Sequence, residues 1–134
     1  MLRFLTDDDQ RLLLEKARRL TYSPGEVIIA EGSTQQALYL VHAGHVRVER
    51  ERLGAPTAVT RLGPGELFGE MAFVEERGAS ASVVADGTVE VDVVDGSHVH
   101  ALLMSVPGLA ARFFQSLAVT LSNRLRETSE KARG

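Results

Sequence analysis

The sequence contains no cysteine, which excludes disulfide bonds, a thiolate nucleophile and a cysteine-bound metal. It has no apolar run approaching the roughly 20 residues that a membrane-spanning helix requires. The N-terminus leads directly into acidic residues and lacks the apolar core of a signal peptide. Basic and acidic residues are interspersed, and a net charge of −3 argues against a dedicated nucleic-acid surface. We therefore expect a cytoplasmic protein that has no membrane span and, by itself, no direct DNA binding.

The composition and the pattern of the chain indicate one globular domain. The 134 residues suit a single core, and 44% of them are apolar and 25% charged, as in ordinary globular proteins. The pattern divides the chain into a helix over residues 6–20, short strands over 21–95 and further helices over 96–131. We therefore predict one domain, residues 1–134, that is mainly β with flanking helices.

The N-terminal helix is predicted from its start signal and its spacing. The Thr6 hydroxyl can cap free N–H groups, and the three aspartates that follow favour the positive end of the helix dipole. Leu13, Ala17 and Leu20 then recur at helical spacing. The Ser-Pro-Gly turn at residues 23–25 ends this segment.

Turn signals at short intervals predict strands at residues 27–29, 38–42, 46–50, 57–62, 83–84 and 89–94. Ala43 and Gly44 lie between the second and third of these strands and predict a hairpin. Asp86 and Gly87 separate the last two strands. Such closely spaced turns favour an all-β barrel or sandwich over alternating strands and helices.

The last predicted helix carries a wide apolar stripe. Apolar residues recur every four positions at Leu109, Phe113, Leu117, Leu121 and Leu125. The stripe can pack on the chain's own barrel, or it can pair with the same helix of a second copy across a two-fold axis. We expect a homodimer formed through residues 108–130.

Residues 67–83 read L-F-G-E-M-A-F-V-E-E-R-G-A-S-A-S-V and form the most informative motif. They resemble the phosphate-binding cassette of cyclic-nucleotide-binding domains, which reads approximately F-G-E-(L/M)-A, a variable spacer, and R-(S/A)-A-(S/T)-V. The resemblance extends to Gly44 and to the G-P-G-E-L-F-G-E run at residues 63–70. Near the C-terminus, Thr128 and Ser129 resemble a pair that reaches the adenine ring in the bacterial catabolite activator type of this family.

The resemblance implies a jelly-roll (double-stranded β-helix) barrel that acts as a regulatory sensor and not as an enzyme. It would bind a cyclic nucleotide, cAMP in preference to cGMP given Thr128 and Ser129, and would need no cofactor or metal. Binding would couple to movement of the C-terminal helix and so to an attached or separate effector domain. The implied ligand-binding residues are Phe68, Gly69, Glu70, Met71, Arg77, Ala79, Ser80, Ala81, Thr128 and Ser129.

The residue types of the cassette suit such a ligand. Gly69 lets the backbone approach closely, and a short helix starting at Glu70 would direct N–H groups at an anion. The Glu70 carboxylate is suited to accept a hydrogen bond from a ribose 2′-hydroxyl. Small residues at Ala79 and Ala81 let backbone N–H groups approach a phosphate, and the Ser80 hydroxyl adds a donor. Three apolar residues suit either contact with sugar and base or the plain barrel core: Val48, Val59 and Leu62.

The chain has Ala79 where the family motif has an arginine. An arginine makes charge-assisted, often bidentate hydrogen bonds to a phosphate, and each such bond lost should cost roughly 1.5–3 kcal/mol. Arg77 could replace it by turning inward, or Arg77 could be a solvated loop residue near Glu75 and Glu76. Backbone donors could also hold the nucleotide weakly. Alternatively, the domain could have lost the ligand and kept its fold for dimerisation or docking.

His98 and His100 raise a further alternative, a metal enzyme of the cupin type, which shares the jelly-roll barrel. The two histidines precede an apolar stretch that reads as helix and contains no acidic ligand. Two surface histidines are therefore the favoured interpretation.

Overall fold

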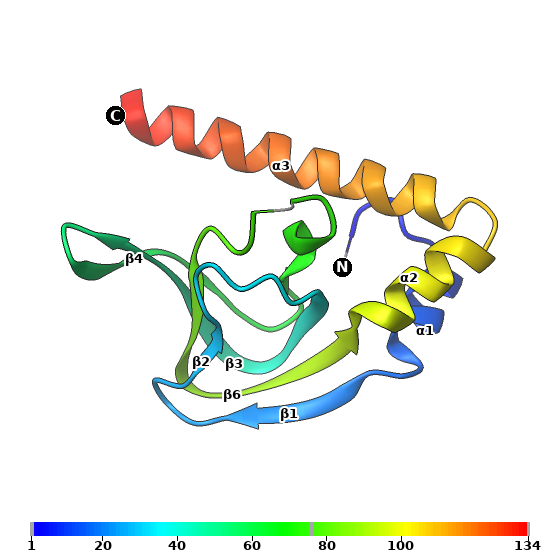
Figure 1. The fold of residues 1–134 in the computed structure, drawn as a ribbon, viewed down its shortest axis with the longest axis horizontal. Coiled ribbons are helices and arrows are strands. Elements are labelled where there is room, and N and C mark those ends of the chain that lie inside the picture. The colour runs from blue at the N-terminus through cyan, green and yellow to red at the C-terminus, as the bar shows by residue number, and fades with distance from the viewer. Residues whose placement is uncertain (1, 76, 134) are drawn as a thin grey trace.

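The computed structural model describes residues 2–75 and 77–133, without the side chains of residues 124 and 127–133. The strands in this part of the chain are β1 (Arg18–Tyr22), β2 (Val27–Ile29), β3 (Ala37–Arg52), β4 (Ala55–Leu62), β5 (Leu67–Phe68) and β6 (Ser82–Asp95). The helices are α1 (Asp7–Leu14), the short 3₁₀ helix η1 (Glu70–Phe73), α2 (Gly96–Ser105) and α3 (Leu109–Arg133). Figure 1 shows α3 running along one side of the molecule, with the strands on the other side and η1 between them. None of the described helices combines the length and the apolar character that a membrane crossing demands.

The strands form one antiparallel sheet that curls into a roll, which confirms the mainly β fold class (Figure 1). Its order is β1-β6-β3-β4, with β2 joined to β6 and β5 joined to β3. In the described chain β1 and β4 are the edges and do not pair with each other, so the roll is open and not the closed barrel expected from the sequence. The physical reason is that β4 and the end of β3 project from the body as a hairpin, which leaves β4 away from β1 (Figure 1).

Two strands are longer and more continuous than the sequence predicted. The hairpin expected at Ala43 and Gly44 is not formed, because β3 passes through both residues with a shift in its register against β6. Gly44 has a φ of +85°, and a Cβ there would lie 2.4 Å from the carbonyl oxygen of Thr88. β6 likewise continues through Asp86, which pairs with His45. Irregular pairing therefore bends these strands without ending them.

The N-terminal helix is shorter than the predicted 6–20. It begins as expected, because the Thr6 hydroxyl accepts a hydrogen bond from the Asp9 N–H at 3.0 Å and the Asp9 carboxylate accepts one from the Thr6 N–H at 2.9 Å. It ends at Leu14, and β1 follows within a few residues. Antiparallel pairing of β1 with β6 outweighs the helical spacing of the sequence there.

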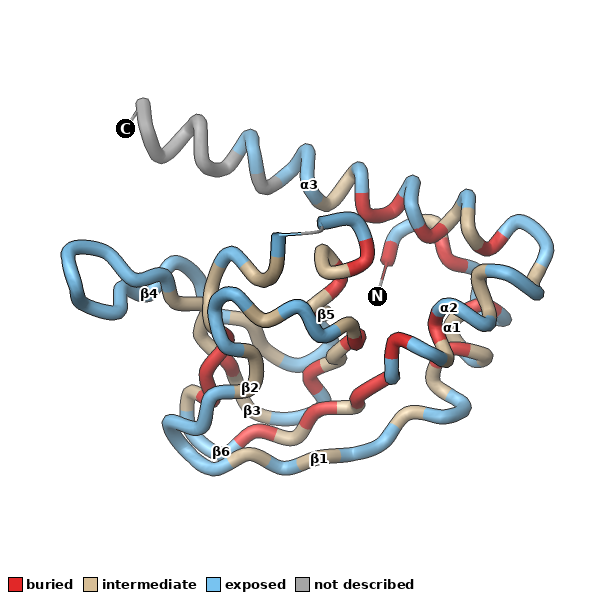
Figure 2. The backbone as a smooth tube through the Cα atoms, in the orientation of Figure 1, coloured by how far each residue is buried: buried red, intermediate tan, exposed pale blue. Residues whose placement is uncertain are grey.

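Two clusters of buried apolar residues make the core, one beneath the helices and one inside the roll. Figure 2 shows the first half of α3 with buried stretches along its length. Leu109, Phe113 and Leu117 are at most 2% exposed, as the stripe predicts. Leu121 and Leu125 are 41% and 61% exposed. Only the first half of the stripe therefore packs on the chain's own domain.

An ion pair ties α1 to α3. Arg112 Nε donates to Asp9 Oδ2 at 2.6 Å, and Arg112 Nη2 donates to Asp9 Oδ1 at 2.8 Å. These hydrogen bonds lower the pKa of the Asp9 carboxyl from 3.8 to about 2. Nearby, the backbone N–H of Phe4 donates to Ser116 Oγ at 2.9 Å. The N-terminal segment is thus fastened along the first turns of α3.

Candidate ligand-binding site

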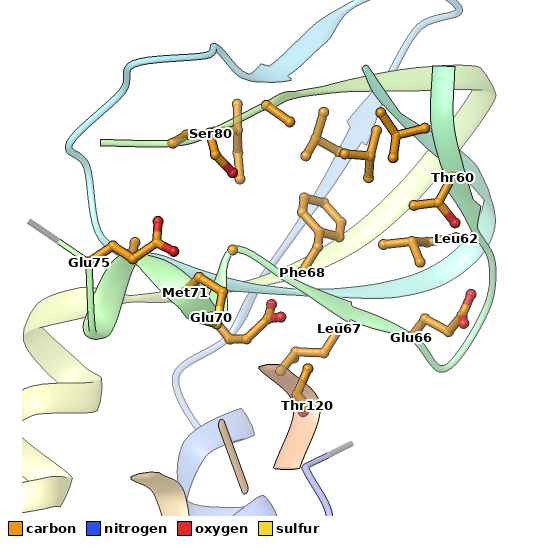
Figure 3. A pocket seen from close by; sticks show the side chains of 18 of the residues that line it. Thr60, Leu62, Glu66, Leu67, Phe68, Glu70, Met71, Glu75, Ser80 and Thr120 are labelled. Atoms are coloured by element: carbon orange, nitrogen blue, oxygen red, sulfur yellow. The ribbon is translucent and has the colours of Figure 1, made fainter. Parts of the chain in front are cut away.

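A cavity of about 660 Å³ opens between the roll, η1 and α3. Its lining comes from β3 and β4, from residues 65–72, from residues 78–81 and from α3. Figure 3 shows Ser80 on one side of the cavity and Thr120 of α3 on the opposite side, with Glu70 between them. A space of this size suits a small organic ligand.

The first half of the cassette lines the cavity. Phe68, at the end of β5, is 3% exposed and stacks on the Tyr39 ring, with 4.8 Å between centroids and 8° between planes. Gly69 has a φ of +84°, and a Cβ there would lie 2.8 Å from a backbone carbonyl oxygen of β3. Glu70 begins η1 and is 2% exposed, and Met71 follows it. All four residues lie at the cavity.

The second half of the cassette forms another part of the lining, with Ala79, Ser80 and Ala81 at the cavity. The backbone N–H of Ala79 donates to the Ser33 carbonyl oxygen at 2.8 Å, and the Ala79 carbonyl oxygen accepts from the Gly32 N–H at 2.8 Å. These two bonds fix the path of the loop against the turn that follows β2. Because the Ala79 N–H already donates to Ser33, the amides of Ser80 and Ala81 are more suitable than that of Ala79 as donors to a ligand.

Arg77 is exposed and is not one of the residues that line the cavity. Ala79, at the arginine position of the motif, does line it. Of the two interpretations of Arg77, the structure therefore has the solvated one. Within the described part of the cassette, no guanidinium group reaches the cavity.

The three apolar residues that suited either a ligand or the core, Val48, Val59 and Leu62, all line the cavity. They come from β3 and β4 and form a wall to one side of Phe68. Figure 3 shows Leu62 and Thr60 on this wall. This side of the cavity is therefore apolar, as the lining of ligand pockets usually is.

Thr120 and Asn123 of α3 also line the cavity, and sequence analysis did not identify them. They follow the buried Ser116 by four and seven residues, so helical spacing is the one signal that could have found them. The predicted adenine-contacting side chains, Thr128 and Ser129, lie outside the described residues. Within the described residues, the part of α3 at the cavity is that of Thr120 and Asn123.

Among the residues that the structure describes, the charged ones that line the cavity are Arg50, Arg61, Glu66, Glu70 and Glu75. Arg61 Nε donates to Asp86 Oδ2 at 2.6 Å, and this hydrogen bond lowers the pKa of the Asp86 carboxyl. Glu66 Oε2 accepts from the backbone N–H of Gly63 at 2.6 Å. Arg50 makes no ion pair with another described residue. Neither arginine was identified as a site residue from the sequence.

His98 and His100 contact different neighbours. His98 Nε2 lies 2.9 Å from the Leu12 carbonyl oxygen. His100 Nε2 lies 2.6 Å from Gln36 Oε1, and Gln36 Nε2 donates to the Ala72 carbonyl oxygen at 2.8 Å. Among the described residues, no three histidine, aspartate or glutamate side chains are placed to bind one metal ion. The geometry gives a cupin-type centre no support.

Comparisons with known proteins agree with the cassette and the roll. The chain is 39% identical over 124 residues to the cyclic AMP receptor protein of Thermus thermophilus, covering 92% of this chain and 56% of that protein. It is 28% identical over 123 residues to cyclic GMP-binding protein C of Dictyostelium discoideum, covering 91% of this chain and 5% of that protein. The solved structure of the Thermus thermophilus catabolite activator protein superposes with a TM-score of 0.79 at 36% identity, covering 96% of this chain and 59% of that one.

This chain thus spans between a half and two thirds of the length of the two Thermus proteins. The family model described as the cyclic nucleotide-binding domain matches residues 19–106, which include the roll, the cassette and α2. The chain belongs to the cyclic nucleotide-binding domain family.

Proposed function

We propose that this chain is a regulatory sensor domain that binds cAMP, in preference to cGMP, in the cavity beneath α3. The observation that carries the proposal is that the cassette and α3 line one cavity. Glu70 and Ser80 come from the cassette, and Thr120 and Asn123 come from the helix. A ligand held there would contact both, so its binding could be transmitted to α3.

The preference for cAMP has two supports. Thr128 and Ser129 resemble the adenine-contacting pair of the catabolite activator type. The Thermus relative, which is 39% identical over 92% of this chain, carries the name cyclic AMP receptor protein.

The chemistry of the lining suggests how the nucleotide lies. The buried Glu70 carboxylate would accept a hydrogen bond from the ribose 2′-hydroxyl. The Ser80 hydroxyl and the amides of Ser80 and Ala81 would donate to the phosphate oxygens. Val48 and Leu62 would cover the sugar and base. Loss of the 2′-hydroxyl would then remove a hydrogen bond to a charged acceptor.

A pair of aromatic rings would connect the cassette to α3. Phe73, at the end of η1, meets Phe113 edge to face with 5.7 Å between the ring centroids. Gln36 holds the same segment by donating to Ala72, and His100 of α2 contacts Gln36. A ligand that draws η1 toward its phosphate group would move Phe73. The movement of Phe73 would favour a different position of α3 on the roll. Binding would thereby shift a two-state equilibrium.

The exposed apolar residues of α3 suit a homodimer through residues 108–130. Phe114, Leu121 and Leu125 are 41%, 41% and 61% exposed. Apolar residues at this spacing are costly to leave in water and would be covered by the same helix of a second copy. An attached or separate effector domain would receive the signal.

Isothermal titration of the chain with cAMP, cGMP and AMP tests the proposal. We expect cAMP to bind with micromolar affinity and AMP, which lacks the cyclic phosphodiester, to bind much more weakly. Glu70→Gln should weaken cAMP by about ten-fold, because a charged acceptor is lost. The same variant should barely change the affinity for 2′-deoxy-cAMP. Glu75→Gln removes a carboxylate from an exposed part of the lining and serves as the matched control.

Two results would contradict the proposal. The absence of heat up to millimolar ligand would show that the cavity binds no cyclic nucleotide. The second candidate function is then a domain that binds no nucleotide and keeps its fold for dimerisation or docking. Ala79, at the arginine position of the motif, is the observation that favours it. If Glu70→Gln weakens the binding of cAMP and of 2′-deoxy-cAMP by the same factor, Glu70 supports the fold and does not contact the ribose 2′-hydroxyl.

A further inference from the structure

The described lining holds few positive charges for a site that would bind an anion. Among the described residues, its cations are Arg50 and Arg61. The guanidinium of Arg61 is already bound to Asp86 at 2.6 Å. A cyclic phosphodiester entering this cavity therefore needs a positive charge that the cassette does not supply at Ala79.

Arg50 is the remaining cation of the described lining. It has no ion pair with another described residue, and it is exposed at the mouth of the cavity. Arg77, the cation of the cassette loop, lies outside the lining. Arg50 is thus a charge at the cavity that no other group in the described chain neutralises.

The register of the sheet places Arg50 beside the cassette. Val48 pairs with Val83 and Glu49 pairs with Ser82, the first residue of β6, where this pairing ends. Arg50 is the next residue of β3, so it lies close to the point where the cassette leads into β6. Because side chains alternate along a strand, Arg50 also shares the face of Val48, which lines the cavity.

We propose that Arg50 supplies the positive charge that meets the phosphate of the bound cyclic nucleotide, in place of the arginine that the family motif has at position 79. The proposal rests on the function proposed above. A guanidinium can donate two parallel hydrogen bonds to a phosphate, and here it would do so from β3 and not from the cassette loop. The positive charge that the family motif has in the cassette loop would thus come from β3 in this chain.

Titration calorimetry of the full chain with cAMP, at low and at high NaCl concentration, tests this assignment. Arg50→Gln should weaken binding by about 10- to 100-fold at low salt, because charge-assisted hydrogen bonds are lost. It should also flatten the dependence of affinity on salt, since an ion pair with the phosphate is screened by salt and a packing contact is not. Arg52→Gln, two residues further along β3 and outside the lining, is the matched control and should bind as the native chain does.

The outcomes separate this inference from the function on which it rests. If the native chain binds no cAMP, the proposed function is wrong and the role of Arg50 is wrong with it. If the native chain binds cAMP and Arg50→Gln binds equally well, the function stands and the role of Arg50 is refuted. A weaker Arg50→Gln with unchanged salt dependence would show a contact with the base, which also refutes the phosphate role. If Arg77→Gln weakens cAMP binding and Arg50→Gln does not, the residue that contacts the phosphate is Arg77, and the role proposed for Arg50 is refuted.

Discussion

Replacing Asp9 with asparagine should remove a part of the stability that depends on pH. The Asp9 side chain is 2% exposed and receives two hydrogen bonds from Arg112, which lower its pKa from 3.8 to about 2. That difference corresponds to roughly 2.5 kcal/mol of the free energy of unfolding at neutral pH. Because Arg112 is 31% exposed and solvent screens the pair, we expect about 1–2 kcal/mol.

The sign of the pH dependence follows from the direction of the shift. The pKa of Asp9 is lower in the folded protein than in the unfolded chain, so the contribution is complete above about pH 5. It is lost as the pH falls through 3.8 toward 2. Asp9→Asn keeps an oxygen that can accept from the Thr6 N–H and so retains the helix cap. The variant should therefore be less stable at neutral pH, and its difference from the native chain should close in acid.

Urea unfolding followed by circular dichroism at a series of pH values measures this difference. Asp8→Asn is the matched control, because its carboxylate is 83% exposed in the same helical turn and pairs with Arg11 at 3.4 Å. That variant should follow the native curve closely at every pH. A constant difference between Asp9→Asn and the native chain across the series would refute the reasoning. The reasoning would also be refuted if Asp8→Asn were destabilised at neutral pH and its difference from the native chain decreased in acid as much as that of Asp9→Asn.

Phe113→Ala should lower the free energy of unfolding by about 3–5 kcal/mol, because the ring is 0% exposed and its removal leaves a cavity. Phe114→Ala, at a side chain 41% exposed, should change the unfolding midpoint little but should weaken self-association in sedimentation analysis if α3 forms the dimer. Gly69→Ala should lower the melting temperature and weaken cAMP binding, since its φ of +84° is strained for alanine and its Cβ would lie 2.8 Å from a carbonyl oxygen. Gly25→Ala shares the backbone strain, with a φ of +83°, but its Cβ meets open space. A melting temperature no lower in Gly69→Ala than in Gly25→Ala would contradict the steric argument.

The cassette could be located from the sequence because its motif is local, and the structure places its residues along one cavity. The positions of Phe68 and Ser80 along the cavity follow from a short run of residues whose spacing is fixed by one loop. The helix cap at Thr6 was predictable for the same reason. The end of α1 at Leu14 was not, because pairing of β1 with a strand some 70 residues later decides it. Gly44 has the composition of a turn, and only its partner strand shows that it marks an irregularity within one strand.

The non-local part of the site was missed for a related reason. Thr120 and Asn123 meet the cassette only after α3 has been placed across the roll. Arg50 comes to the same cavity only because β3 pairs with β6 beside the cassette. Neither contact is encoded in the spacing of nearby residues, so no motif could report them.

The cassette loop keeps its path through hydrogen bonds of the main chain at Ala79, and every residue type except proline offers that same main chain. Evolution can therefore exchange the charged side chains around the ligand while the loop itself persists. The ligand preference of such a domain can therefore change without loss of the fold, because the main chain sets the path of the loop and the side chains set the charge of the site. Descendants of one cassette could in this way come to read different signals with the same loop.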